Sequence, residues 1–170
     1  QTNNVLARKF NHTFRYIDDL LSINDGGEFE QHFKEIYPEE LNLKKENDNN
    51  DSSSFLDLKI DIQNNSFVTS LYDKREDYEF KIVRLPYRSS NIPKKMFTSS
   101  IVTEILRIAR VTSSFESFLT STQVLIKRMI SQGANIYDLK RSTKNIIKKH
   151  WEDFEKYTMT SRVLLISIFA

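Results

Sequence analysis

The chain has 170 residues, a length that suits one compact domain with a single hydrophobic core. Hydrophobic residues make up 39% and charged residues 28%, an ordinary globular composition that excludes a disordered tail as the main content. The chain contains no cysteine, which excludes a disulfide scaffold, a thiolate zinc site, an iron–sulfur cluster and a thiol nucleophile.

The charge is distributed unevenly along the chain. Residues 1–70 hold 7 Lys/Arg against 13 Asp/Glu, and residues 71–170 hold 18 against 10, which together give the net charge of +2. Halves of opposite sign favour two roles, an acidic half that holds cations and a basic half that faces a polyanion such as a phosphate backbone.

Targeting signals are not visible in the sequence. No basic and then apolar leader follows Gln1, and no run of about eighteen apolar residues occurs. We therefore expect an intracellular protein, of the nucleus or cytoplasm, that is neither secreted nor bound to a membrane. We also expect the sequence to be a piece of a longer one.

The first part of the chain predicts a hairpin followed by one short helix. Segments 14–16 and 20–23 are rich in aromatic, β-branched and other apolar residues, so they predict two strands with Asp18 and Asp19 at the tip between them. The pattern then predicts, in order, a short helix over 29–36 that ends before Pro38, a brief strand over 41–44 and a polar loop over 47–54.

A second antiparallel unit follows the polar loop. Apolar and polar residues alternate over 55–62, which predicts a half-buried strand. Asn64 and Asn65 favour a hairpin turn that leads into a second strand over 67–72, and a third strand is predicted over 78–85. These three strands form a predicted meander.

Beyond Pro86 the apolar period changes from two to about three and a half, which predicts three helices and hence an α+β fold class. The second of these helices opens with Ser113 as its N-cap and ends at Gly133, and the third begins at Asn135. The tail over 158–170 is left with three alternatives: a last strand, a helix docked on the bundle, or out-of-frame sequence.

The sequence Tyr16-Ile17-Asp18-Asp19 carries the clearest chemical signal. Two adjacent carboxylates at a hairpin tip repel each other unless a cation lies beside them. Mg²⁺ prefers such oxygen ligands, and two Mg²⁺ ions clamp the attacking and leaving oxygens of an in-line nucleotidyl transfer. An ordinary acidic surface turn is the alternative.

The chain resembles the reverse transcriptases of mobile elements, in particular Penelope-like and related animal retroelement proteins. The resemblance extends to about Trp151 and is most specific in the first part of the chain. The motifs that carry it, in order, are Phe14-Arg15-Tyr16-Ile17-Asp18-Asp19-Leu20-Leu21-Ser22-Ile23, Ile36-Tyr37-Pro38-Glu39-Glu40-Leu41-Asn42-Leu43-Lys44, Phe55-Leu56-Asp57-Leu58, Leu71-Tyr72-Asp73-Lys74-Arg75, Leu85-Pro86-Tyr87 and Ser90-Asn91-Ile92-Pro93.

This resemblance implies RNA-directed DNA synthesis by two Mg²⁺ ions, with deoxynucleoside triphosphates and an RNA or DNA template with its primer as partners. It implies that Asp18 and Asp19 are catalytic metal ligands, that Tyr16 lies beside the primer terminus, and that Lys44 is a catalytic lysine near the incoming phosphates. The implied primer-binding hairpin comprises Phe55, Leu56, Asp57 and Leu58. A solvated lysine beside Lys45 is the alternative for Lys44.

The chain departs from the family pattern in one respect that bears on activity. Polymerase palms place a further Asp on an earlier strand, but residues 1–17 contain neither Asp nor Glu. The fingers and the nucleotide pocket also precede the hairpin in this family. We therefore expect a fragment that cannot polymerise alone.

The resemblance also implies a domain organisation. Residues 1–86 would be the C-terminal part of a palm, and residues 87–157 would be a helical, thumb-like region. Residues 158–170 would be a tail of unknown role.

The helical half is strongly basic. Residues 93–150 hold 11 Lys/Arg against 3 acids, and a thumb would use such charge to follow a nucleic-acid backbone without reading bases. Two alternatives remain: a noncatalytic nucleic-acid-binding module and a helical interaction domain. The residues predicted to contact the backbone are Lys127, Arg128, Lys140 and Arg141.

Overall fold

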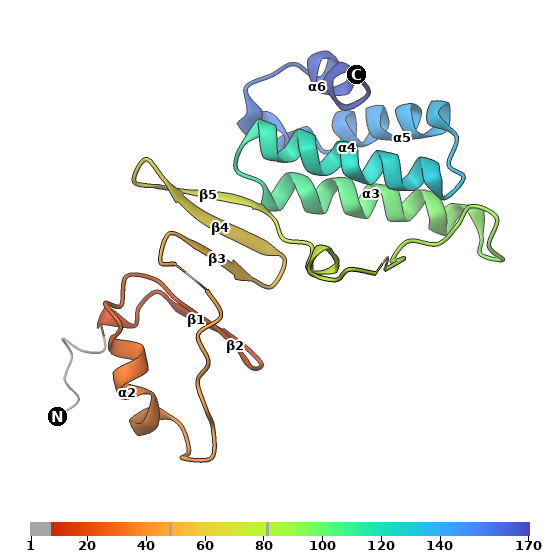
Figure 1. Cartoon of the computed structure of the whole chain (residues 1–170). Coiled ribbons are helices and arrows are strands. Elements are labelled where there is room, and N and C mark those ends of the chain that lie inside the picture. Colours follow the sequence, from red (N-terminus) through yellow and green to blue (C-terminus); the bar gives the residue numbers. More distant parts are fainter. Residues whose placement is uncertain (1–7, 48, 81) are drawn as a thin grey trace.

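The computed structural model describes residues 8–47, 49–80 and 82–170. Within them the chain is α+β, with two small antiparallel sheets and five α-helices, so the predicted fold class is confirmed. Figure 1 shows a two-stranded hairpin with one helix at one end, the other helices at the opposite end, and a three-stranded sheet between them.

The first unit consists of strands β1 (Thr13–Tyr16) and β2 (Asp19–Ser22) and helix α2 (Glu28–Ile36). Helix α2 buries Phe29 and Phe33, and these two rings lie edge-on or stacked against Phe10 and Tyr37. The helix ends at Ile36 because a residue before proline disfavours helical angles, and Tyr37 is extended with φ −117°. This small aromatic cluster holds the hairpin and helix together.

The second unit is a meander of strands β3 (Ser52–Phe55), β4 (Leu58–Gln63) and β5 (Ser66–Leu71), hydrogen-bonded in that order. Asn64 and Asn65 turn β4 into β5 with φ angles of 50° and 60°, left-handed values that asparagine tolerates. The predicted hairpin turn is confirmed, but the single strand predicted over 55–62 is wrong, because Phe55 ends β3, Leu56 and Asp57 form a turn, and β4 begins at Leu58.

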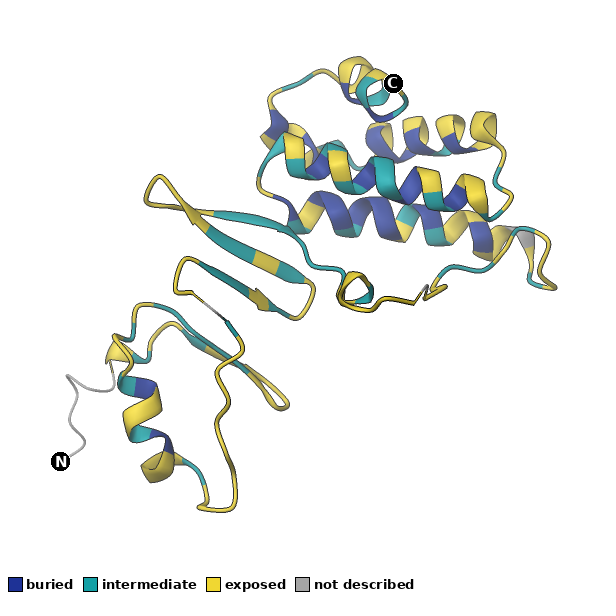
Figure 2. Ribbon diagram, in the orientation of Figure 1, coloured by how far each residue is buried: buried dark blue, intermediate teal, exposed yellow. Residues whose placement is uncertain are grey.

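The third unit is a bundle of helices α3 (Lys94–Val111), α4 (Phe115–Ser131), α5 (Ile136–Lys149) and α6 (Ser161–Ile168). Figure 2 shows that the buried residues concentrate in these helices. Leu164 and Ile168 of α6 belong to the same core, so the tail is a docked helix and the predicted three-helix bundle gains a fourth member. None of the described helices is long and apolar enough to cross a membrane.

Two helix starts show which cap predictions hold. The predicted start of the last helix at Asn135 is confirmed, because the Asn135 side chain caps α5 by accepting a hydrogen bond from the Tyr137 nitrogen at 2.8 Å. For α4 the predicted cap is wrong: Ser114, not Ser113, accepts the hydrogen bond from the Ser117 nitrogen. Ser113 instead accepts a hydrogen bond from the Thr69 backbone nitrogen on β5.

Two predicted strands are wrong. Residues 41–44 have no regular structure, and Leu41 and Leu43 are exposed and pair with no strand in the described part of the chain. The described residues of 78–85 are also irregular, because the chain turns through the 3₁₀ helix η1 (Lys74–Asp77) and runs past α3 and α4 instead of returning along β5. Strand propensity produces a strand only where a neighbour accepts the hydrogen bonds.

Two predicted boundaries also differ from the structure. The polar loop over 47–54 ends early, because Ser52 begins β3 and its hydroxyl donates a 2.6 Å hydrogen bond to Asp61 on β4. The apolar pattern of the last helix predicts that it extends through Trp151 and Phe154, but α5 ends at Lys149; Trp151 lies in the 3₁₀ helix η2 (Trp151–Asp153), and Phe154 lies between it and η3 (Glu155–Tyr157). Phe154 is nevertheless in the core, as its place in the apolar pattern indicates.

Candidate functional site

The predicted hairpin tip is a tight, two-residue turn. Tyr16 pairs with Asp19 across the ladder, so that only Ile17 and Asp18 lie in the loop. Ile17 has φ 53° and is 73% exposed, and a β-branched residue in this left-handed region is strained. The Arg15 Nε donates to the Ile17 carbonyl oxygen at 2.9 Å and supports the turn.

Asp18 and Asp19 are exposed at this tip, with no hydrogen bond or ion pair from either side chain to any described residue. Arg15, a nearby cation in the sequence, does not neutralise them, because its guanidinium binds the Ile17 carbonyl oxygen and the Tyr37 hydroxyl and lies over the Tyr37 ring. The two carboxylates therefore have free oxygens for a cation from solution.

The predicted lysine does not join the two aspartates. Lys44 lies in the irregular segment after α2, with its side chain 82% exposed, and forms a 2.9 Å ion pair with Glu46. No hydrogen bond or ion pair between described residues connects it to Asp18 or Asp19. Its predicted place on a short strand is wrong, and its catalytic role stays a prediction.

The predicted primer-binding residues form a second turn of the same kind. Phe55 pairs with Leu58, and Leu56 and Asp57 lie in the loop. Leu56 has φ 56°, close to the value at Ile17, and is also exposed. The two turns share an aromatic residue, an aliphatic residue at positive φ and an aspartate.

The Asp57 carboxylate is held by the helical bundle. Arg107 on α3 donates from Nη1 to Asp57 at 2.7 Å and from Nη2 to Glu104 at 2.8 Å, and Arg84 approaches the other Glu104 oxygen at 2.9 Å. Glu104 is only 7% exposed. Burial alone would lower the pKa of Arg107, but its hydrogen bonds to Glu104 and Asp57 outweigh burial and raise the pKa. Arg107 is therefore charged at any physiological pH.

A second ion-pair cluster lies at the end of β5. The Asp73 carboxylate accepts two 2.6 Å hydrogen bonds from Arg75 and one of 2.7 Å from Arg128 on α4, which also reaches Glu76 at 3.1 Å. Burial would raise the pKa of Asp73, but the hydrogen bonds from Arg75 and Arg128 hold it well below its ordinary value. Arg128 is thus engaged inside the protein.

A groove of about 740 Å³ separates the chain after β5 from helices α3 and α4. Five carboxylates and four guanidinium groups of described residues line it, and most of these belong to the two clusters above. A phosphate backbone requires an excess of cations, which this lining lacks. Asp18 and Asp19 are not among the lining residues, so the aspartate pair does not lie in this groove.

The structure divides the basic residues of the bundle into two groups. In the bundle, the arginines of α3, α4 and α5 (Arg107, Arg110, Arg128 and Arg141) all form ion pairs, whereas the exposed Arg162 of α6 forms none with a described residue. Its exposed lysines Lys127, Lys144, Lys148 and Lys149 form no hydrogen bond or ion pair with a described residue.

Helix α5 carries most of the unpaired charge. Its four lysines and one arginine face a single acid, Asp138, which pairs with Arg141 at 2.6 Å. Lys140, Lys144 and Lys148 are spaced by four residues and all exposed, so they share one helix face with steps of about 6 Å. Lys140 also lies over the Phe169 ring of the tail. Composition indicated a basic bundle but not which helix presents the charge.

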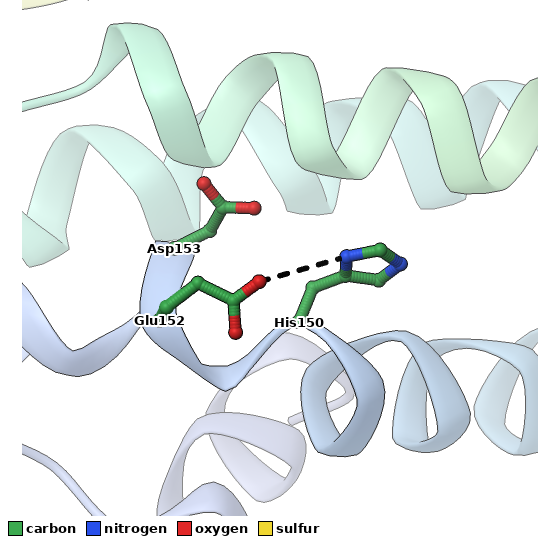
Figure 3. A group of neighbouring side chains, drawn as sticks. All are labelled: His150, Glu152 and Asp153. Carbon is green, nitrogen blue, oxygen red and sulfur yellow. Dashed lines mark ion pairs between the residues drawn. The ribbon is translucent and has the colours of Figure 1, made fainter.

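A third cluster has the residue types of a metal site. Figure 3 shows His150, Glu152 and Asp153 just beyond α5, with ligand atoms within 4.8 Å of one another. Both Asp153 oxygens accept hydrogen bonds from Arg110, at 3.0 and 3.1 Å, and His150 lies 3.9 Å from Glu152. The Asp153 carboxylate therefore already has a cationic partner, and this cluster acts as an ion-pair link between α5 and α3.

Comparison of the chain with protein-family models, with curated proteins and with solved structures finds no significant match.

Proposed function

We propose that the chain is the C-terminal palm and thumb-like part of a retroelement-type reverse transcriptase, whose activity is template-directed DNA synthesis by two-metal nucleotidyl transfer. The observation that carries this proposal is the pair Asp18 and Asp19, exposed and unpaired at the tip of a two-residue hairpin turn. The strained Ile17 backbone beside them supports it, because such strain concentrates at functional sites.

The chemistry expected of the pair follows from its charge. Two adjacent carboxylates with no internal cation attract a divalent ion, and Mg²⁺ bound there keeps open positions for water and substrate phosphates. In such a site Asp18 would be the more direct ligand and Tyr16 would contact the primer terminus. The expected partners are a template with its primer and deoxynucleoside triphosphates.

This chain alone is not expected to polymerise. Two-metal transfer needs a further carboxylate near the pair, and the hairpin and the residues before it supply only Asp18 and Asp19. Incorporation of a nucleotide by the purified 170-residue chain on a primed RNA template would contradict this expectation.

The metal step is tested by titrating the full chain with Mn²⁺ and observing its amide NMR signals. We expect Mn²⁺ to broaden the signals of residues 16–20, because the paramagnetic ion lies beside the tip, and Mg²⁺ to reverse the broadening by competition. The double variant Asp18→Asn/Asp19→Asn is expected to lose this response.

A matched control distinguishes a site from a general attraction of cations to acids. Glu39 and Glu40 are also adjacent and exposed but do not lie at a hairpin tip. The variant Glu39→Gln/Glu40→Gln is expected to respond to Mn²⁺ as the parent does. Equal broadening in both double variants would contradict the metal site.

A second candidate function is a noncatalytic nucleic-acid-binding module. The unpaired lysines on the exposed face of α5 favour it, since backbone binding requires cations that are not neutralised internally. We expect salt-sensitive binding of a DNA primer annealed to RNA, measured by fluorescence anisotropy. Reversing Lys144 and Lys148 to Glu should lower the salt slope by about 2, because each lost phosphate contact removes about 0.9.

The control for this experiment is the variant Lys45→Glu/Lys74→Glu, which changes the net charge equally but outside α5. It is expected to keep most of the parent's salt slope. Binding without any Mn²⁺ response at Asp18 and Asp19 would favour the binding module over the polymerase. Undetectable binding at low salt would contradict both.

A further inference from the structure

The β3–β4 turn is tied to the helical bundle by one side chain. Arg107 on α3 donates a 2.7 Å hydrogen bond to the Asp57 carboxylate, across fifty residues of sequence. The Asp57 carbonyl oxygen meanwhile accepts from the Tyr72 backbone nitrogen at 2.8 Å, so the turn is anchored both to the bundle and to the end of β5.

The contacts of Arg107 indicate that its role is to orient the β3–β4 turn rather than to stabilise the fold. Its Nη2 donates a hydrogen bond to one oxygen of Glu104, and Arg84 forms an ion pair with the other oxygen. Its buried Nε has no hydrogen-bond partner in the described part of the chain. Leaving a buried donor unpaired is costly, and an apolar contact would stabilise this junction at lower cost. A planar guanidinium that binds Glu104 and Asp57 at once instead fixes the orientation of the Asp57 carboxylate relative to α3.

The turn that Arg107 holds has an exposed tip. Leu56 is strained and exposed, and the Asp57 side chain is 58% exposed even though it is ion-paired. The tether therefore does not bury the turn, but fixes the position of an accessible tip relative to the helices.

We propose that Arg107 is a positioning residue, which through Asp57 holds the Phe55–Leu58 turn in a fixed relation to the bundle so that the turn meets the primer strand of a nucleic acid bound by the helices. This inference rests on the proposed function. It assigns a role to a residue that sequence patterns do not single out, because Asp57 and Arg107 meet only in the folded chain.

Photo-crosslinking with the full chain tests this positioning. A Leu56→p-benzoylphenylalanine variant places the probe at the tip, and the nucleic acid is a DNA primer annealed to RNA. We expect crosslinks to the primer strand, and we expect the additional change Asp57→Ala to reduce their yield about fivefold, the effect of losing about 1 kcal/mol of restraint. The hybrid is present at a saturating concentration for every variant, so that the crosslink yield reports the position of the tip and not the affinity.

Three further variants make the result specific. Asp57→Glu keeps the charge and should restore at least half of the crosslink yield. Arg107→Lys keeps the charge but cannot bridge Asp57 and Glu104 as a planar fork does, so it should resemble Asp57→Ala. Asp138→Ala removes an ion-paired aspartate of similar exposure on α5, since the Asp138 side chain is 55% exposed, and should leave the yield unchanged.

The outcomes separate the two levels of the proposal. Crosslinking of the parent with an undiminished yield in Asp57→Ala and Arg107→Lys would overturn the positioning role while leaving the proposed function in place. Absence of primer crosslinks in the parent, despite binding of the hybrid, would overturn the proposed primer contact and the positioning role with it. Faster amide exchange at residues 55–58 in Asp57→Ala would show that the variant acts through the turn.

Discussion

The Ser113 hydroxyl oxygen accepts a hydrogen bond from the Thr69 backbone nitrogen at 2.8 Å, and the Ser113 backbone nitrogen donates to the Thr69 carbonyl oxygen at 2.9 Å. These bonds join strand β5 to the loop between α3 and α4. The ion pairs from Arg107 to Asp57 and from Arg128 to Asp73 join the same two units elsewhere. The meander is thus fastened to the bundle at the β3–β4 turn, at Thr69 on β5 and at Asp73 just after β5.

The first prediction concerns the boundary that these contacts imply. Residues 41–47 are irregular and almost entirely exposed, whereas β5 and the β3–β4 turn are held to the bundle. We expect brief trypsin digestion to cut first after Lys44 or Lys45, because proteases need an extended and accessible backbone. Mass spectrometry of the early products should find the meander and the bundle on one fragment.

The expected result differs from a boundary near residue 86, which a palm followed by a thumb predicts. Early separation of the meander from the helices would favour that boundary. The variant Lys44→Gln/Lys45→Gln, which removes both sites, provides the control and should delay the first cut.

The second prediction separates two neighbouring serines. Ser114 caps α4, so Ser114→Ala should lower the free energy of unfolding by about 1 kcal/mol, the usual value of an N-cap. Ser113→Ala removes one side-chain hydrogen bond but keeps the backbone bond to Thr69, so about 0.5 kcal/mol is expected. Urea unfolding followed by the fluorescence of Trp151, the single tryptophan, measures both; the reverse order would contradict the observed cap.

The parts of the fold that the sequence predicts are those determined by local chemistry. The periodicity of α3, α4 and α5, the Asn64-Asn65 turn and the acidic hairpin tip all depend on residues near each other in sequence. The failures depend on partners that are distant in sequence. Ser52 joins a strand because β4 and the Asp61 side chain accept its hydrogen bonds, and the described residues of 78–85 form no strand because none of them pairs with β5.

The candidate site also has some features that the local sequence predicts and others that only folding determines. The aspartates at the hairpin tip are visible in the sequence because turn chemistry is local. Arg128 and Lys144 look equivalent in a charge count, but only folding brings Asp73 against the arginine and leaves the lysine unpaired. The positive φ of Ile17 was not predictable either, because isoleucine is among the residues least suited to it.

The third prediction tests the strain in the two turns. Ile17→Gly and Leu56→Gly remove the Cβ that disfavours positive φ, so each should relieve about 1 kcal/mol of local strain, partly offset by the entropy of glycine in the unfolded chain. Amide exchange at residues 15–20 and 55–58 measures the local effect. A matched change at a turn position with negative φ, Asp18→Gly, should loosen its hairpin instead.

The fourth prediction concerns alkaline pH and the core of the bundle. The Tyr157 hydroxyl lies 2.8 Å from the Thr112 hydroxyl and donates to the Ala109 carbonyl oxygen at 3.1 Å, and the ring stacks on Phe118. Burial raises the pKa of Tyr157 to about 12, above the ordinary value of about 10.

A raised pKa means that folding favours the protonated phenol. The corresponding stability is fully present below pH 10, where both states are protonated, and is lost as the pH rises from 10 to 12 because only the unfolded chain ionises. The free energy of unfolding should fall by about 1 kcal/mol between pH 9 and 11 from this group alone. Denaturant unfolding at a series of pH values, followed by Trp151 fluorescence, measures the loss.

Tyr157→Phe isolates the contribution of this phenol. The variant should be about 1 kcal/mol less stable near pH 7, because the hydrogen bonds to Thr112 and Ala109 are lost. Its stability should then fall less steeply above pH 10 than that of the parent, so that the two curves approach each other. Tyr137→Phe, at an exposed tyrosine on α5, is the matched control and should follow the parent curve; parallel curves for parent and Tyr157→Phe would show that the buried phenol ionises as readily in the folded chain as in the unfolded one.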